Sequence, residues 1–259
     1  MDLTLAIATL PLWLSAFLLV VIPTLVTMCG PAVVRHFVGL EMITVNNEVA
    51  GFKFATLGVI YAVLLGFAVI VVWERFSEAE GVATREAGAV ASMFRLSTGF
   101  DSNTEASFRG RLSEYTKSVI VDDWPEMWRG RESLRTRKAL NDLYRTVLSY
   151  STNNPRDAVV IGEFLNQLDH VTQERRQRLE LAAGIVPGLI WLVLLLGAMI
   201  TLSFTFFFGL ENLRAQIAMT GMLALLIYLA LFVAASIDHP FTGPIRVTPE
   251  SLNLVLEDL

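Results

Sequence analysis

The chain has 259 residues, of which 54% are hydrophobic and 17% charged, and its formal net charge is −5. A mean hydropathy of +0.54 is too high for an ordinary soluble domain, in which about 25% of residues are charged. The acidic balance, without a basic stripe, argues against a nucleic-acid partner, and the single cysteine, Cys29, excludes an intrachain disulfide.

Charged side chains are concentrated in the middle of the chain. Residues 74–183 hold 16 of the 20 lysines and arginines and 17 of the 25 aspartates and glutamates. The rest is apolar over long runs, which is typical of membrane spans around a polar insert. The sequence therefore predicts membrane parts at 1–73 and 182–237, an insert at 74–181 and a tail at 238–259.

Four apolar segments are long enough to cross about 30 Å of hydrocarbon, which takes roughly 20 helical residues. They are residues 3–28, 54–73, 182–208 and 215–237. The first segment lacks a basic leader region and is too long for a cleavable signal peptide, so it is predicted to remain as a span. The spans that contain Pro11, Pro23 and Pro187 are predicted to be kinked, which membrane helices tolerate.

Basic residues close to the spans predict the orientation, because cytoplasmic flanks carry the excess of lysine and arginine. With the N-terminus inside, six arginines flank the inner ends of the spans and three basic residues flank the outer ends. The inner set is Arg75, Arg85, Arg175, Arg176, Arg178 and Arg246, and the outer set is Arg35, Lys53 and Arg214. Both termini and the insert are therefore predicted to be cytoplasmic.

The insert is predicted to be a helical bundle. The second span continues without proline into helix formers, so a single helix is expected from about residue 48 to 97, with Asn47 as a candidate cap and Gly99 after its end. Three further helical segments follow, and no segment alternates like a strand. The last of them is predicted to run straight into the third span. The fold class is therefore an all-α membrane protein, with an antiparallel helical bundle inserted between the second and third spans.

The sequence shows no constellation for catalysis or metal binding. The glycine-rich phosphate loops, the nucleophile elbow and the zinc-protease motif are all absent. His36, His170 and His239 lie far apart in sequence without ligand spacing. No enzyme activity, metal or cofactor is predicted.

Two faces of the second span differ in side-chain size. At 100° per residue, the small residues Ala55, Gly58, Ala62 and Gly66 share one face, which predicts a seam where helix backbones pack closely. A larger apolar face lies roughly 100° away. In a ring of identical helices this second face would point to the axis, with Val59, Val63 and Phe67 as a hydrophobic neck, Thr56 at the outer end and Glu74 at the cytoplasmic end. Small-residue faces also occur in membrane proteins that conduct nothing. The pattern therefore fits either a pore-lining helix or a helix that only packs against other helices.

A resemblance to a known family favours the pore-lining interpretation. The stretch VLLGFAVIVVWERF (63–76) resembles the second-helix motif of bestrophin channels, and Asp238, Pro240, Phe241 and Gly243 belong to a stretch similar to the Pro-Phe-Gly that follows their fourth helix. The longer stretch from NNEVAGFKF to TREAGAV resembles uncharacterised bacterial membrane proteins described as bestrophin-like. This resemblance implies a pentameric ion channel of the bacterial inner membrane, in which the second helices line the pore and Val59, Val63 and Phe67 occupy the neck positions.

The sequence also departs from bestrophins of animals. Their acidic run after Pro-Phe-Gly, which helps to bind calcium, is replaced here by PIRVTP (244–249), so a calcium clasp is not expected. Residues 240–243 fit either a turn that ends the fourth helix or a functional motif.

The predicted partners are membrane lipid, further copies of the chain and small ions, with a weak preference for monovalent cations because of Glu74. The alternative is a non-conducting scaffold or stress sensor that signals through its helical stalk.

Overall fold

The computed structural model describes residues 10–45, 47–184 and 186–258, and these residues form helices and turns without any strand. The chain divides into two compact units. Of the described residues, the apolar unit comprises 10–45, 47–74, 186–238 and 243–245, and the polar unit comprises 75–184, 239–242 and 246–258. The long helix α5 (Asn47–Ser97) contributes its first part to the apolar unit and its second part to the polar unit.

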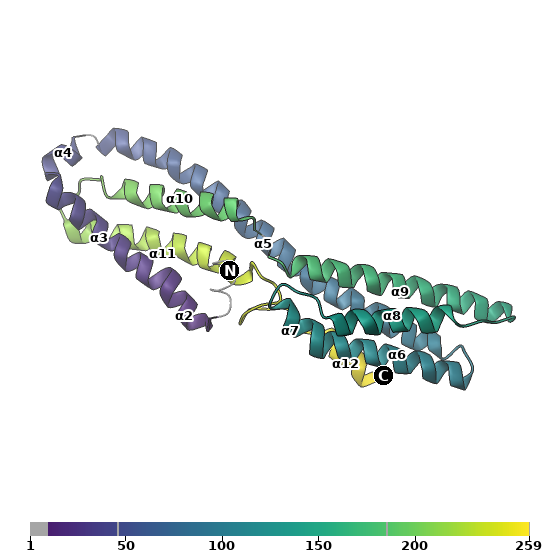
Figure 1. Ribbon diagram of the computed structural model, residues 1–259. Coiled ribbons are helices and arrows are strands. Elements are labelled where there is room, and N and C mark those ends of the chain that lie inside the picture. Colours follow the sequence, from purple (N-terminus) through teal and green to yellow (C-terminus); the bar gives the residue numbers. More distant parts are fainter. Residues whose placement is uncertain (1–9, 46, 185, 259) are drawn as a thin grey trace. The chain divides into compact units, whose positions relative to one another are not determined.

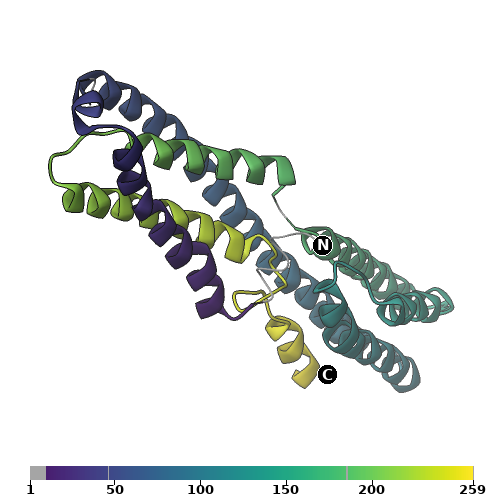
Figure 2. The same cartoon turned by 60° about the vertical axis from the view of Figure 1, so that its left-hand side comes forward.

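The apolar unit is built from long helices that pack side by side. Its elements are α2 (Leu12–Ala16), the π-helical turn η1 (Phe17–Val21), α3 (Ile22–Phe37), α4 (Leu40–Thr44), the first part of α5, α10 (Gly188–Thr205) and α11 (Leu213–Ile237). Helix α11 packs along α3 and η1, and α10 contacts both α3 and α11. Figures 1 and 2 show α3 and α11 running alongside each other.

One face of α5 packs into the apolar unit. Tyr61 and Leu65 are buried in a cluster with apolar residues of α10 and α11. The Tyr61 hydroxyl donates a hydrogen bond to the Leu194 carbonyl oxygen at 3.2 Å. Gly197 permits this close approach, since a Cβ at that position would lie 2.6 Å from the Tyr61 ring.

The polar unit is a bundle with its own apolar core. Besides the second part of α5 it contains α6 (Ser102–Ser118), η2 (Val119–Asp123), α7 (Trp124–Met127), α8 (Leu134–Leu148), α9 (Pro155–Leu181) and α12 (Glu250–Asp258). Side chains of Asp101, Ser133 and Asn154 accept hydrogen bonds from backbone N–H groups in the first turns of α6, α8 and α9, which explains why these helices begin there. The predicted helical character of the insert is confirmed.

Four helical segments in the described part of the chain are long and apolar enough to cross a membrane: Leu12–Phe37, Asn47–Ser97, Gly188–Thr205 and Leu213–Ile237. The predicted first segment began at residue 3, and its residues 3–9 lie outside the described residues. The helix in the structure continues beyond residue 28 to Phe37. The predicted single helix from about 48 to 97 is confirmed by α5, although the Asn47 side chain pairs with the backbone of Gly209 rather than with α5.

Two predictions about proline and helix continuity are wrong. Helix α9 ends at Leu181 and α10 begins only at Gly188, so the insert does not run straight into the third apolar helix. Pro187 occupies the N-cap of α10, and Pro11 occupies the N-cap of α2. Neither residue kinks a helix, because proline lacks the N–H that a helix interior needs and is tolerated where a helix starts.

Candidate pore-lining face

The predicted neck residues lie on the side of α5 that its own chain leaves uncovered. Val59, Val63 and Phe67 are 64%, 50% and 66% exposed, whereas Tyr61 and Leu65 are 4% and 9% exposed. Each exposed residue is two positions from a buried one, which is a rotation of about 200° around the helix. The face that carries the three residues is thus opposite the face that packs inside the apolar unit.

The predicted small-residue seam is also uncovered by the chain itself. Ala62 and Gly66 follow Tyr61 and Leu65 directly, so they lie about 100° from the buried face. A Cβ added at Gly58 or Gly66 would meet no atom within 4 Å. Ala55 and Ala62 are exposed as well, so within the described part of the chain nothing packs closely against the small residues.

The two predicted ends of the exposed face differ in chemistry. Thr56 is exposed, and its hydroxyl donates to the Phe52 carbonyl oxygen at 3.2 Å, which satisfies it on its own helix. Glu74 is also exposed. Its neighbour Arg75 pairs with Glu78 at 2.7 Å. The positive charge next to Glu74 is thus engaged in an ion pair with a different carboxylate.

The residues after α11 form a turn that is anchored by buried contacts. Asp238 is 1% exposed, and its carboxylate accepts hydrogen bonds from the Val186 N–H at 2.9 Å and from Nε1 of Trp191 at 3.2 Å. Val186 lies two residues before α10, and Trp191 lies in the first turn of that helix. Asp238 therefore ties the beginning of α10 to the end of α11 within the apolar unit.

Phe241 is a buried anchor within the polar unit. It is 1% exposed, and its ring meets the Trp124 ring edge-on with centroids 5.7 Å apart. The Val247 N–H donates to the Pro240 carbonyl oxygen at 2.7 Å, and the Val247 carbonyl accepts from Nε1 of Trp124 at 3.2 Å. Gly243 has φ +86°, a left-handed conformation that favours glycine. These contacts account for the motif residues as parts of a turn, whatever further role they have.

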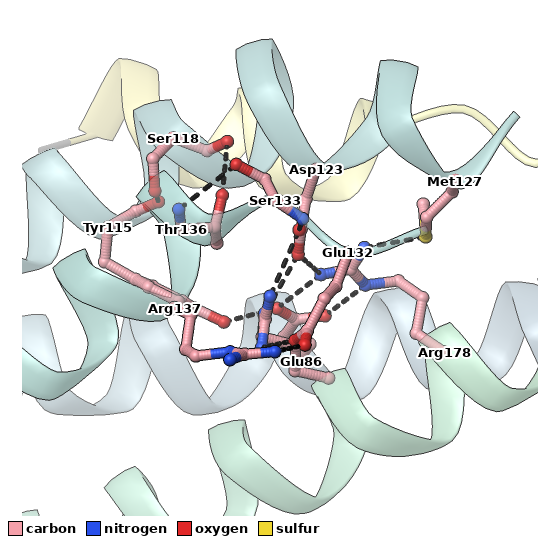
Figure 3. A network of polar contacts seen from close by, with 11 residues as sticks. Glu86, Tyr115, Ser118, Asp123, Met127, Glu132, Ser133, Thr136, Arg137 and Arg178 are labelled. Carbon is pink, nitrogen blue, oxygen red and sulfur yellow. Dashed lines mark hydrogen bonds and ion pairs between the residues drawn. The ribbon is translucent and has the colours of Figure 1, made fainter. Parts of the chain in front are cut away.

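The polar unit contains a buried network of charges that sequence reasoning missed (Figure 3). Arg178 and Glu86 are fully buried and joined by two hydrogen bonds, from Nε to Oε2 at 2.7 Å and from Nη2 to Oε1 at 3.2 Å. The Tyr115 hydroxyl donates to the same Oε1 at 2.7 Å. The Arg178 guanidinium also lies over the Trp124 ring at 4.6 Å from its centroid. The network connects α5, α6, α7 and α9.

Asp123 extends this network to a second arginine. It is fully buried and accepts two hydrogen bonds from Arg175, at 2.9 and 3.1 Å, and one from Arg178 at 3.3 Å. The Ser133 N–H donates to its Oδ1 at 2.8 Å. Glu132 contacts Arg175 at 3.6 Å and also pairs with Arg137. Buried carboxylates and guanidinium groups are therefore matched and hydrogen-bonded, as burial of charge requires.

Comparison with known proteins identifies the family of this architecture. The model of the bestrophin-like domain matches residues 21–252. The chain belongs to the bestrophin-like family. No curated protein matches it. Together with its four apolar helices, this membership makes the chain a membrane protein.

Solved structures share the bestrophin-like fold at low identity. A crystal structure of a bacterial bestrophin homologue from Klebsiella pneumoniae covers 92% of this chain and 96% of its own, with a TM-score of 0.68 and 14% identity. A point variant of that homologue gives a TM-score of 0.73 at 16% identity, covering 92% of this chain and 94% of its own. The expected membership of the bestrophin-like family is thus confirmed. The similarity to these solved structures is a similarity of fold.

Burial and charge shift the ionisation of the network in this bestrophin-like chain. Burial raises the pKa of Tyr115 well above its ordinary 10.0, and the neighbouring Glu86 carboxylate raises it further. For Arg178, burial lowers the pKa, but the attraction of Glu86 and its hydrogen bond outweigh burial, so the pKa ends above its ordinary value. Arg178 therefore keeps its charge at every physiological pH.

The raised pKa of Tyr115 makes the stability of the polar unit depend on alkaline pH. Above pH 10 the unfolded chain loses the Tyr115 proton while the folded chain keeps it, so the folded state binds more protons and its stability falls as pH rises. One such proton contributes a slope of about 1.4 kcal/mol per pH unit. Urea unfolding of Tyr115→Phe, followed by circular dichroism between pH 9 and pH 11, should show a smaller loss than wild type. An unchanged slope would contradict this assignment.

The sequence did contain a weak signal for this network. Glu86, Arg175 and Arg178 lie on helices at positions where the helical period places buried residues, such as Val82, Val90 and Val171. Charged residues on an apolar face indicate buried pairs, but the period does not say which residue of which helix is the partner. The histidines give no such signal, and among the described residues no group of three or more histidine, cysteine, aspartate or glutamate side chains could hold a metal ion.

Proposed function

We propose that the protein is a homo-oligomeric ion channel of the bacterial inner membrane, most simply a pentamer, in which copies of α5 line a central pore. In this arrangement the four apolar helices cross the membrane. Both termini and residues 74–181 lie on the cytoplasmic side, in keeping with the distribution of basic residues. Membership of the bestrophin-like family and the shared fold support a channel.

The exposed face of α5 is the observation that carries this proposal. Within one subunit, Tyr61 and Leu65 use one side of the helix, while Val59, Val63 and Phe67 on the opposite side touch no other part of the fold closely enough to be buried. The small residues between these two faces would allow α5 helices of neighbouring subunits to approach closely. If neighbouring α5 helices pack through their small residues, the face with Val59, Val63 and Phe67 points toward the axis of the ring.

The chemistry of that face suits a gated pore. Rings of Val59, Val63 and Phe67 would form a narrow apolar neck, which closes to ions when water leaves it. Thr56 would lie at the outer end and Glu74 at the cytoplasmic end. A ring of Glu74 carboxylates would concentrate cations. Because Arg75 pairs with Glu78, its positive charge compensates the negative charge of Glu74 less. A weak preference for monovalent cations follows.

Two measurements on the purified protein test the proposal. Reconstituted into planar bilayers, wild-type protein should pass current above the lipid background. In detergent, its mass should correspond to four or five subunits. A compact dimer without current would instead support the non-conducting scaffold that signals through its polar unit.

Neutralising Glu74 should weaken cation preference. With Glu74→Gln the ring loses its negative charge, so the reversal potential measured across a gradient of KCl should move toward zero, by an amount that falls at high ionic strength because surface charges are screened. Glu80→Gln is a matched control, because Glu80 is also an exposed carboxylate on α5 but does not lie at the end of the apolar run. Equal shifts of the reversal potential in the two variants would show that Glu74 does not line the pore.

A further inference from the structure

The two ends of the helical bundle in the polar unit differ in chemistry. The loops at 98–101 and 149–154 lie together at one end, where the rings of Phe100 and Tyr150 meet edge-on with centroids 5.2 Å apart (Figure 1). Neither loop contains a lysine, an arginine or a large exposed apolar side chain. The other end carries α7 and the loop at 128–133, which contains Arg129 and Arg131.

The end with α7 is also the end at which the chain enters the polar unit from α11. Pro240 follows the last residue of α11, Ile237, by three residues and therefore lies within about 11 Å of it. The Val247 N–H donates to the Pro240 carbonyl, and the guanidinium of the preceding Arg246 lies 4.5 Å from the centroid of the Trp128 ring. Because α11 is long and apolar enough to cross a membrane, we expect Trp128 near the level at which α11 leaves the bilayer.

The loop at this end is basic, and its arginines are accessible. The side chains of Arg129 and Arg131 are 64% and 66% exposed, and both pair with the same carboxylate, that of Glu126. Together with Arg246, three positive charges thus face one negative charge. Two more carboxylates at this end are paired with other arginines: Asp122 with Arg135, and Glu132 with Arg137 and Arg175. Exposed ion pairs are weak, so Arg129 and Arg131 remain available to another anion.

Apolar side chains are exposed beside these arginines. Trp128 is 43% exposed, Val121 65% and Leu134 73%. Val121 and Leu134 line an open groove of about 580 Å³ together with Pro125 and Arg131. Tryptophan is enriched at membrane–water interfaces because its ring is amphipathic, and arginine binds phosphate through two parallel hydrogen bonds. This combination of side chains therefore fits a phospholipid surface.

We propose that one surface of the polar unit binds the anionic phospholipid headgroups of the leaflet in which α11 ends. This proximal surface consists of Val121, Trp128, Arg129, Arg131, Leu134 and Arg246. The arginines would pair with headgroup phosphates, while the tryptophan ring and the two aliphatic side chains would lie at the boundary with the acyl chains. The proposal goes beyond channel function and does not depend on it, because it requires only that α11 crosses the membrane.

Spin labels at the two ends of α8 test the contact with lipid. The full-length protein carries Cys29→Ser and a nitroxide on either Leu134→Cys or Leu148→Cys, and is reconstituted into phosphatidylcholine bilayers with or without phosphatidylglycerol. Leu148 is the matched control, because it is 67% exposed on the same helix at the opposite end. Power-saturation electron paramagnetic resonance measures access of oxygen, which concentrates in the bilayer, and of a nickel chelate, which stays in water.

The expected result depends on lipid charge. At position 134 the ratio of oxygen access to nickel access should rise when phosphatidylglycerol is added, and the rise should shrink at high salt because surface charges are screened. At position 148 the ratio should stay the same in all bilayers. A ratio at position 134 that is the same with and without phosphatidylglycerol would overturn the proposal.

Two double substitutions of equal charge test the role of the arginines. Arg129→Gln/Arg131→Gln alters the proximal surface. Arg145→Gln/Arg156→Gln is the control, because Arg145 is 74% exposed and pairs with the carboxylate three residues before it, as Arg129 does, and Arg156 is exposed in the first turn of α9. Each basic residue near an anionic surface strengthens binding about fivefold. The ratio of lipid-contacting to water-exposed label at position 134 should therefore fall roughly tenfold or more in the first variant and stay unchanged in the second.

Two further outcomes would contradict the proposal. Equal responses of the two double variants would show that Arg129 and Arg131 do not contact lipid. Loss of both oxygen access and nickel access at Leu134→Cys would mean that protein covers the groove, which would assign the proximal surface to a second copy of the chain. All four arginine side chains are exposed, so folding is preserved in both variants and circular dichroism verifies it.

Discussion

Replacing both Val63 and Phe67 with alanine is expected to increase the current through the reconstituted protein several-fold. A pore neck lined by bulky apolar side chains resists ions because water leaves the narrow apolar space. Alanine keeps the helix intact and removes most of the side-chain volume from two successive turns. Because both residues are exposed in the subunit, the change leaves no cavity in its core. Planar-bilayer recordings at equal amounts of reconstituted protein measure the effect.

The matched control for this variant is Leu64→Ala. Leu64 is 45% exposed on the same stretch of α5, but it lies about 100° from Val63 and therefore outside the proposed neck. Its current should equal that of wild type. If wild type and the double variant both pass no current above the lipid background, the pore proposal is lost. If Leu64→Ala raises the current as much as the double variant, α5 lines a pore through a different face.

Replacing Arg178 with methionine is expected to destabilise the polar unit by about 3–5 kcal/mol, the cost of removing one partner from a buried ion pair. Methionine fills most of the apolar part of the side chain, so the main loss is electrostatic. Glu86 and Asp123, both fully buried, would lose hydrogen bonds and a compensating charge. Hydrogen exchange of the backbone amides in α9 and the second part of α5, followed by mass spectrometry, reports the loss locally.

Arg176→Met provides the control for this effect. Arg176 lies on the same helix, its side chain is 83% exposed, and it pairs with Glu180 only at the surface. Exposed pairs of this kind contribute about 0–1 kcal/mol, so exchange should change little. The double variant Glu86→Gln/Arg178→Met should be more stable than Arg178→Met alone, because one uncompensated charge has been removed. Equal exchange in Arg178→Met and Arg176→Met would show that the buried network contributes nothing to stability.

The network also bears on how the polar unit holds α5. Glu86 belongs to α5, Tyr115 to α6 and Arg178 to α9. Tyr115 and Arg178 both donate hydrogen bonds to the carboxylate of Glu86. Hydrogen bonds that converge on a carboxylate impose direction and distance, unlike apolar contacts, which tolerate sliding. The register of α5 against α6 and α9 is therefore set at Glu86. A change of that register would require several buried bonds to break together.

The sequence by itself determined the helices and most of their faces. The stretch from residue 48 to 97 contains no proline and keeps helical spacing throughout, and α5 forms one helix over that stretch. The positions of Val59, Val63 and Phe67 on one face, and of Gly58, Ala62 and Gly66 on another, follow from 3.6 residues per turn alone. Whether these faces line a pore and a subunit seam remains the prediction that the experiments above address.

Only the tertiary structure decided which face of α5 packs within the subunit and which charges meet. Tyr61 and Leu65 are no more apolar than the exposed Val63 and Phe67, so their burial depends on Leu194 and its neighbours on α10. Glu86 and Arg178 are 92 positions apart and Asp123 and Arg175 are 52 apart, distances over which helical periodicity carries no information. Helical spacing is local, whereas buried ion pairs and cavities are made by segments that come together only when the chain folds.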